Sequence, residues 1–150
     1  MGCSRILVEG ITIKNSPFWT IHLVYCDNVI VRSITIDSHY PNNDGCDPES
    51  TSNVLIEECI FRTGDDAIAI KAGRDADGRE IGRPSKNIVI RNCLFQSECN
   101  GLCIGSEMSG GVENIYMDNI QIGTVKNAFI LNPTVTEEDI FVIYKSAILL

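Results

Sequence analysis

The segment DNVIVRSITI, residues Asp27 to Ile36, occurs in five related copies and decides the fold. The other gapless copies are SRILVEGITI from Ser4, SNVLIEECIF from Ser52, KNIVIRNCLF from Lys86 and ENIYMDNIQI from Glu113. Within each copy, apolar residues recur at every second position, with a change of phase in the middle. Because successive side chains of a strand point to opposite faces, this pattern predicts two short strands that meet at a bend.

The spacing of the copies predicts how these strands are arranged. Successive copies start 23, 25, 34 and 27 residues apart. Units repeated at such intervals can stack as coils, with each strand pairing to its equivalent about 4.8 Å above and below. We therefore expect an all-β parallel β-helix of about five coils. One column of like residues would be an amide ladder at a turn, formed by Asn28, Asn53, Asn87 and Asn114.

The composition is that of one folded domain. Of the 150 residues, 44% are hydrophobic and 21% are charged, which argues against long disorder. The net charge of -8 would repel a phosphate backbone, so we expect no nucleic-acid partner. We expect no membrane partner, because no apolar run approaches the ~20 residues that cross a bilayer, and no secretory signal follows Met1. The seven cysteines contain no CxxC pair, and we expect buried thiols.

The longest interval contains an insertion, residues 72–85, which reads AGRDADGREIGRPS. Its Gly, Asp and Pro residues predict an exposed loop. Because a loop that projects from a stiff stack can form the wall of a cleft, we expect a groove beside it.

Three carboxylates are the candidate catalytic groups. Asp65 and Asp66 follow the third copy, and Asp44 lies at a similar distance after the second copy, so stacking would bring all three together. Adjacent residues can share one cleft only at a turn, which Gly64 allows. Crowded carboxyl groups raise one another's proton affinity, which suits general acid and base work on a glycosidic bond. A calcium site or a solvated Asp-Asp turn would give the same spacing.

Several motifs in combination resemble glycoside hydrolase family 28, the polygalacturonases and related pectin hydrolases. They lie between residues 4 and 129 and read KNSPFWTIH from Lys14, CDNVIVRSITI from Cys26, NNDGCDPES from Asn42, GDDAIAIK from Gly64, SKNIVIRNC from Ser85 and IGSEMSGGVENIY from Ile104. The resemblance implies a right-handed, single-stranded parallel β-helix that binds a pectic polysaccharide or oligogalacturonide in an open groove. It also implies hydrolysis of α-1,4-galacturonosidic bonds with inversion, without a metal or organic cofactor.

The resemblance also implies roles for particular residues. The family's Asn-x-Asp motif matches Asn42-Asn43-Asp44, and its Asp-Asp motif matches Asp65-Asp66. Asp65 would be the general acid, and Asp44 with Asp66 would activate the attacking water. Asn42 is a candidate substrate-binding residue.

Two motifs of the family are missing. Its Gly-His-Gly falls where this chain reads Glu98-Cys99-Asn100-Gly101, and Asn100 can bind substrate by hydrogen bonds but cannot carry a proton at neutral pH. Its Arg-x-Lys motif, which binds the galacturonate carboxylate, is absent from FILNPTVTEEDIF, residues 129–141. Lys71 and Arg74 are therefore candidate substrate-binding cations, although solvated charges on a loop are the commoner outcome for both and for Arg79.

The sequence favours two regions, the β-helix in residues 1–129 and an atypical tail in residues 130–150. Codons can be chosen for the tail so that the same DNA, read one base earlier, encodes a segment similar to the family's next one. A frameshift is therefore one interpretation. The chain is expected to be an internal fragment whose uncapped coil ends favour self-association. Family members are mostly secreted or periplasmic. An inert carbohydrate-binding β-helix is the alternative function, and a calcium-dependent lyase is a third.

Overall fold

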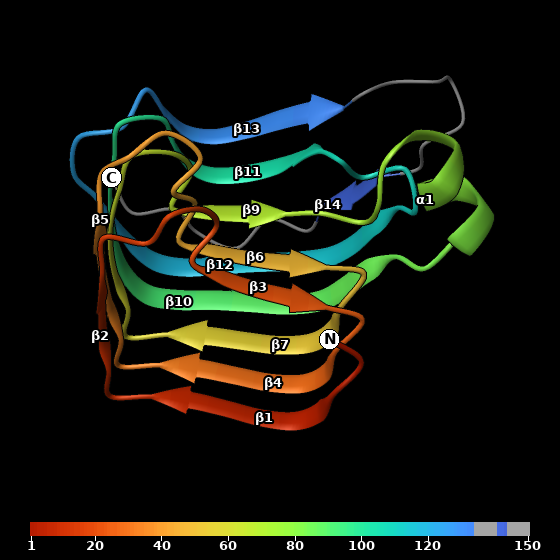
Figure 1. The fold of residues 1–150 in the computed structure, drawn as a ribbon, viewed down its shortest axis with the longest axis horizontal. Helices are drawn as coiled ribbons and strands as arrows, with labels where there is room; N and C mark the ends of the chain where they lie inside the picture. The colour runs from red at the N-terminus through yellow and green to blue at the C-terminus, as the bar shows by residue number, and fades with distance from the viewer. Residues whose placement is uncertain (134–140, 144–150) are drawn as a thin grey trace.

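The chain winds into a right-handed parallel β-helix, as the repeats and the resemblance predict (Figure 1). The computed structural model describes residues 1–133 and 141–143. Three faces run along the stack, two in one continuous sheet (sheet A) and one in a second sheet (sheet B). Figure 1 shows the coils stacked in chain order from β1 to β13, with sheet B nearest the viewer.

The strands of each face come from successive coils. The first face of sheet A contains β1 (Ser4–Glu9), β4 (Asp27–Arg32), β7 (Ser52–Glu57), the first halves of β10 (Ser85–Ser97) and β12 (Val112–Ile122), and β14 (Phe141–Ile143). Its second face contains β2 (Thr12–Lys14), β5 (Thr35–Ser38), β8 (Ile60–Thr63) and the second halves of β10 and β12. Sheet B contains β3 (Ile21–Val24), β6 (Cys46–Glu49), β9 (Ile68–Ile70), β11 (Asn100–Ser106) and β13 (Asn127–Pro133).

The strand register confirms the alignment of the five copies. The first residues of the copies pair in one row across parallel strands, from Ser4 through Asp27, Ser52 and Lys86 to Glu113. The bend in each copy is a single residue in the left-handed region, as at Ser33 with φ 52° and Asn92 with φ 54°. This explains the change of phase, because one left-handed residue turns the strand without adding a loop.

The predicted amide ladder is present for three of its four members. Asn87 Nδ2 donates to Asn53 Oδ1, and Asn114 Nδ2 donates to Asn87 Oδ1, each at 3.0 Å. Asn53 donates to Asp27 Oδ1 at 2.8 Å, while Asn28 also donates to Asp27. The asparagines adopt φ near 56°, a conformation that Asn tolerates better than most residues.

The interior is a continuous apolar column. It contains the inward-facing Val and Ile side chains of all faces together with Phe61 and Phe95, whose ring centroids lie 5.8 Å apart. Five of the seven cysteines are buried and all seven are free thiols, as expected. Cys59 and Cys93 occupy the same repeat position inside the stack. Burial of this column fixes the rotational setting of each coil, and therefore of the turns that carry the polar residues.

The insertion differs from the predicted loop, because residues Asp75–Ile81 form helix α1. Asp75 and Asp77 lie in its first turn, and Gly82 ends it with φ 55°, donating its N–H to Gly78 O. These are favourable positions for acidic residues and for glycine, respectively. The helical signal in the sequence is weak because the helix has seven residues and contains Gly78. Figure 1 shows α1 projecting at one end of the sheet-B strands, where the predicted cleft wall would lie.

The last described strands continue the stack. β13 pairs with β11 from Asn127 as far as Pro133, past the predicted boundary at Phe129. The segments 134–140 and 144–150 lie outside the described residues, so the interpretation of the tail as out of frame stays a prediction. At the opposite end, β1 pairs with β4, and self-association through coil ends also stays a prediction. Within the described residues, no helix has the length and apolar character needed to cross a bilayer.

Candidate active site

The three predicted carboxylates lie in the turns that lead into sheet B. Asp44 precedes β6, and Asp65 and Asp66 lie between β8 and β9. Gly45 N donates to Asp66 O, and Ala67 N donates to Asn100 O, each at 2.9 Å. Asp44, Asp66 and Asn100 therefore occupy one column on three successive coils. The structure brings the acids together as stacking predicts, and their catalytic roles stay predictions.

Two glycines allow the chain to turn at this column. A Cβ atom at Gly45 would lie 2.4 Å from Ala67 O and 2.5 Å from Phe61 Cδ1. A Cβ atom at Gly64 would lie 2.3 Å from Tyr40 O. The predicted turn at Gly64 is present. A glycine is needed there because the preceding coil approaches closely.

Asp65 and Asp66 share the turn but have different surroundings. Asp65 is half-buried, and its Oδ1 accepts the backbone N–H of Asp66 at 3.0 Å. Its carbonyl oxygen accepts hydrogen bonds from Thr63 Oγ1 and Ser97 Oγ, both at 2.6 Å. These bonds fix the backbone of the turn and leave the Asp65 carboxylate the more accessible of the pair.

Asn100, a candidate substrate-binding residue, binds Asp66. Its backbone N and its Nδ2 both donate to Asp66 Oδ1, at 3.1 and 2.7 Å. Its Oδ1 accepts from Asn127 Nδ2 at 2.8 Å. Because two N–H groups point at one carboxylate oxygen, Asn100 orients Asp66.

A lysine links Asp44 to two acids that the sequence analysis did not single out. Lys71 Nζ lies 3.7 Å from Asp44 Oδ2, 3.9 Å from Asp47 Oδ2 and 3.1 Å from Glu107 Oε2. The indole ring of Trp19 covers the ammonium at 4.3 Å from the ring centroid. The prediction of a solvated loop charge is wrong for Lys71, whose side chain is 5% exposed. Its place directly after the buried strand β9 was the available signal.

Burial dominates the protonation of this cluster. It raises the pKa of Asp44 to about 6, against the lowering effect of Lys71 and with a further rise from Asp65 and Asp66. Burial also raises the pKa of Asp47 well above its usual range, and neither carboxyl oxygen of Asp47 has a hydrogen-bond partner. Burial therefore favours the protonated form of Asp47, and Asp44 changes its charge near pH 6.

The remaining predicted site residues lie outside this cluster. Asn42 is exposed, with φ 59°, on the turn that leads to Asp44. The neighbouring Asn43 is buried. Its side-chain amide forms hydrogen bonds with Ser38, Tyr40, Ser16 and Phe18. Arg74 precedes α1, and its side chain is 75% exposed and paired with Asp75 at 3.3 Å. Arg79 is also exposed, so the prediction of solvated charges is confirmed for both arginines.

One group of side chains has the spacing of metal ligands. Ligand atoms of Asp65, Asp66 and Cys99 all lie within 4.8 Å of one another. A cysteine binds a metal as the thiolate, and burial with the nearby Asp66 and Asp65 raises the pKa of Cys99 to about 11. The group therefore favours a neutral thiol beside two carboxylates.

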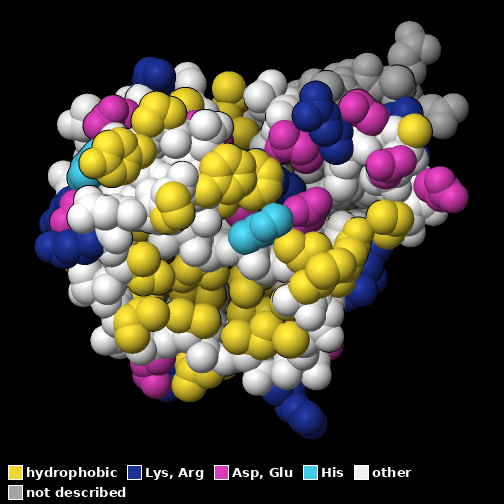
Figure 2. Space-filling view, in the orientation of Figure 1, with side chains coloured by type: hydrophobic (Ala, Val, Ile, Leu, Met, Phe, Trp, Pro, Cys, Tyr) yellow, Lys and Arg dark blue, Asp and Glu magenta, His cyan; other side chains and the backbone are white. Residues whose placement is uncertain are grey.

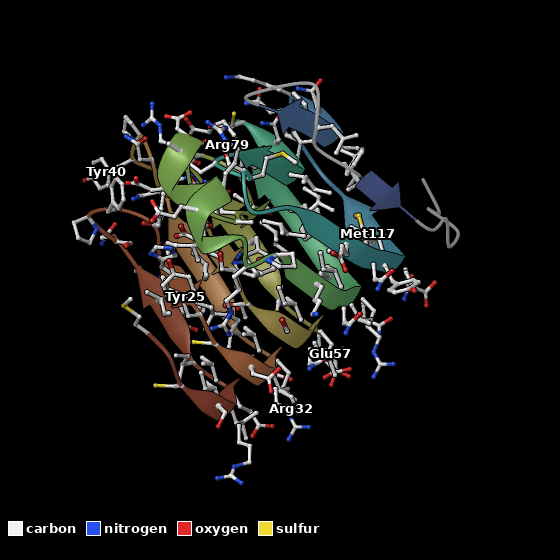
Figure 3. All side chains as sticks on the ribbon, turned by 90° about the vertical axis from the view of Figure 1, so that its right-hand side faces the viewer. Tyr25, Arg32, Tyr40, Glu57, Arg79 and Met117 are labelled. Atoms are coloured by element: carbon white, nitrogen blue, oxygen red, sulfur yellow. The ribbon has the colours of Figure 1, made fainter. Side chains whose placement is uncertain are left out.

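Asp44 and Asp66, with Asp65 beside them, form an acidic column. Aromatic side chains border this acidic column on the side of β3. Trp19 stacks on Phe18 with ring centroids 4.9 Å apart and meets the edge of His22 at 5.0 Å. His22 Nε2 lies 2.6 Å from Glu49 Oε2. Figure 2 shows hydrophobic side chains, a histidine and acidic side chains close together on this face, with mixed charges over α1. Figure 3 shows Arg32 and Glu57, at the ends of the neighbouring strands β4 and β7 of sheet A, away from this face.

Comparison with known proteins assigns the family. The model for Glycosyl hydrolases family 28 matches residues 2–132. This chain belongs to glycosyl hydrolases family 28.

Solved family 28 structures share the fold. An exopolygalacturonase from Thermotoga maritima superposes with a TM-score of 0.85 at 54% identity over 87% of this chain, which corresponds to 30% of the Thermotoga chain. A family 28 exopolygalacturonase from Yersinia enterocolitica has the same TM-score, 0.85, at 23% identity, and covers 92% of this chain and 24% of its own. The second likeness supports the fold alone.

Among curated family 28 relatives, a probable polygalacturonase from Vitis vinifera is 39% identical over 80% of this chain and 25% of its own length. An exo-poly-alpha-D-galacturonosidase from Dickeya chrysanthemi is 26% identical over 79% of this chain and 20% of its own. The chain thus spans about a quarter of the length of these two relatives.

Proposed function

We propose that the acidic column hydrolyses the α-1,4-galacturonosidic bonds of pectin or of oligogalacturonides with inversion. The observation that supports this most is the stacking of Asp44 on Asp66, with Asp65 beside them, in a chain that belongs to family 28. Like charges on successive coils oppose folding, so their presence favours a catalytic use.

The proposed roles follow from the environment of each acid. Asp65 is the most accessible of the three and donates a proton to the leaving oxygen. Asp66 is oriented by two N–H bonds from Asn100, and Asp44 is ionised above about pH 6. These two carboxylates accept the proton of the attacking water, which an inverting reaction places between the base and the sugar.

Two exposed residues are proposed to contact the polysaccharide. Asn42 lies on the turn that precedes Asp44, and Arg74 lies beside α1 at the end of the sheet-B strands. A guanidinium can pair with a galacturonate carboxylate by two parallel hydrogen bonds. Asn100 acts on the substrate through Asp66, because its amide is already bound on both sides.

Hydrolysis by the 150-residue chain is the direct test. We expect release of reducing ends from polygalacturonate, with inverted anomers in the first products by NMR. Asp65→Asn should lower kcat by about 10²–10⁴-fold, the usual contribution of a general acid. Asp118→Asn, an exposed carboxylate of sheet A, is the matched control and should retain the rate.

Three outcomes would contradict the proposal. Binding of oligogalacturonide without turnover would support the inert binding module. Unsaturated products that absorb in the ultraviolet and vanish with chelator would support the calcium-dependent lyase. Retention of the rate in Asp65→Asn would refute the assigned acid.

A further inference from the structure

The ammonium of Lys71 is enclosed by groups from three other coils. Trp19 precedes β3, Asp44 and Asp47 flank the start of β6, and Glu107 follows β11. Lys71 itself follows β9, where its backbone pairs with Glu49. Its hydrogen bond goes to Glu107 at 3.1 Å, and its opposite contacts are the indole and the two aspartates.

This enclosure disagrees with a role in binding the sugar carboxylate. A lysine that pairs with a galacturonate needs N–H groups directed into the groove, whereas this side chain is 5% exposed. The indole covers the ammonium, and a cation held on an aromatic face in a desolvated setting is stabilised there. Arg74 shows the contrast, because its side chain is open to an external anion.

Asp44 depends on Lys71 for its charge. It faces Asp47 on β6, Asp65 and Asp66 from the turn before β9, and the Cys103 thiol on β11. Among the residues that the structure describes, Asp44 makes one ion pair, which is with Lys71. Without this cation, a buried carboxyl group among other acids would keep its proton.

We infer that Lys71 is a positioning residue, which holds Asp44 ionised and in place so that Asp44 can accept the proton of the attacking water. The inference rests on the proposed function, in which Asp44 is a base. Glu107 anchors Lys71 from the far side, and Trp19 excludes water from the ion pair. Asp47 completes the enclosure from β6, with its Oδ2 3.9 Å from the ammonium.

The charge states agree with this arrangement. Burial lowers the pKa of Lys71, but Asp47, Glu107 and Asp44 together raise it by more than burial lowers it. The net shift is upward, so the side chain stays a cation. Burial raises the pKa of Glu107, and Lys71 overcomes that effect, so the net shift is downward and Glu107 stays an anion.

The first experiment measures the titration of Asp44 in the full chain by carboxyl-carbon NMR, with Lys71→Met and Lys71→Arg as variants. In Lys71→Met the midpoint should rise by about one pH unit or more, a tenfold gain in proton affinity. Lys71→Arg should restore most of the wild-type midpoint, because it keeps the charge. Lys14→Met, which removes an exposed cation from another face, is the control and should leave the midpoint unchanged. An unmoved midpoint in Lys71→Met would overturn the inference.

Kinetics separate positioning from substrate binding. With oligogalacturonide, Lys71→Met should lower kcat and move the acid limb of its pH profile upward while KM stays within about twofold. A raised KM with an unchanged kcat would instead make Lys71 a substrate ligand and overturn the inference. If the wild-type chain releases no reducing ends, the proposed function fails, whereas the NMR titration still decides whether Lys71 controls Asp44.

Lysine labelling tests the inference on the wild-type chain, so it holds even if Lys71→Met does not fold. During reductive methylation, Lys14 and Lys86 should react readily and Lys71 slowly, with or without oligogalacturonide. Fast labelling of Lys71 that oligogalacturonide prevents would show a lysine open to the substrate and overturn the inference.

Discussion

Two columns of the same solenoid stack their charges in opposite ways. On the first face of sheet A, the residues in register alternate in sign through Glu9, Arg32, Glu57, Arg91 and Asp118. Arg32 pairs with Glu9, and Arg91 pairs with Glu57, each at 2.6 Å. In the turns before sheet B, by contrast, Asp44 lies on Asp66 with Asp65 adjacent.

The difference separates stability from function. Parallel stacking places equivalent residues about 4.8 Å apart, so unlike charges attract and like charges repel at every coil. The alternating column uses this geometry favourably at the surface. The acidic column opposes it inside the protein, where Lys71 pairs with Asp44 and Asn100 donates two N–H groups to Asp66. A cost of this kind is expected at a catalytic site and not in a scaffold.

The largest effect is expected where the acidic column meets the core. Gly45→Ala should lower the free energy of unfolding by about 1–3 kcal/mol, because the new methyl group overlaps Ala67 O and the Phe61 ring. It should also displace Asp44. Urea unfolding measures the change. Gly123→Ala is the matched control, because the nearest atom there belongs to the flexible Gln96 side chain, and it should cost less. Equal losses in both variants would contradict this explanation.

Removal of the charge that Asp44 carries in a buried position, next to other acids, should stabilise the chain. Since the pKa of Asp44 is raised from 3.8 to about 6, the native state binds more protons than the unfolded state between these values. Stability therefore falls as pH rises through this window. Above it, Asp44 is ionised and its full destabilising effect is present. Asp44→Asn should gain about 1–2 kcal/mol at pH 7 and almost nothing below pH 4.

Urea unfolding of Asp44→Asn at both pH values checks the sign. The same variant should lose hydrolytic activity, so stability and activity should change in opposite directions. A loss of stability at pH 7 would show that Asp44 supports the fold.

The smallest effect is expected from reversal of one sign in the alternating column. Arg91→Glu places three acidic residues in a row with Glu57 and Asp118. Because these groups are near the surface, the loss should be only about 0.5 kcal/mol at low salt, and 1 M NaCl should remove most of it. Thermal unfolding at the two salt concentrations measures this, with Arg91→Gln as the neutral control. A loss that salt does not reduce would point to packing of the arginine stem.

The prediction of the site succeeded for residues whose position follows from stacking. Similar spacing from aligned repeats placed Asp44 near Asp65 and Asp66, because a parallel register converts sequence offset into spatial position. It failed for Lys71 and for the insertion. Whether a lysine after a buried strand is solvated depends on Trp19, Asp47 and Glu107, which lie on other coils, and a seven-residue helix with an internal glycine has little signal of its own.

The sequence by itself determined the parallel β-helix, its register and its membership of a hydrolase family, since a repeated two-strand pattern has few other ways to bury its apolar face. Only the tertiary structure decided which acids are charged. Proton affinity depends on burial and on neighbours from several coils, and those neighbours meet only when the stack has formed.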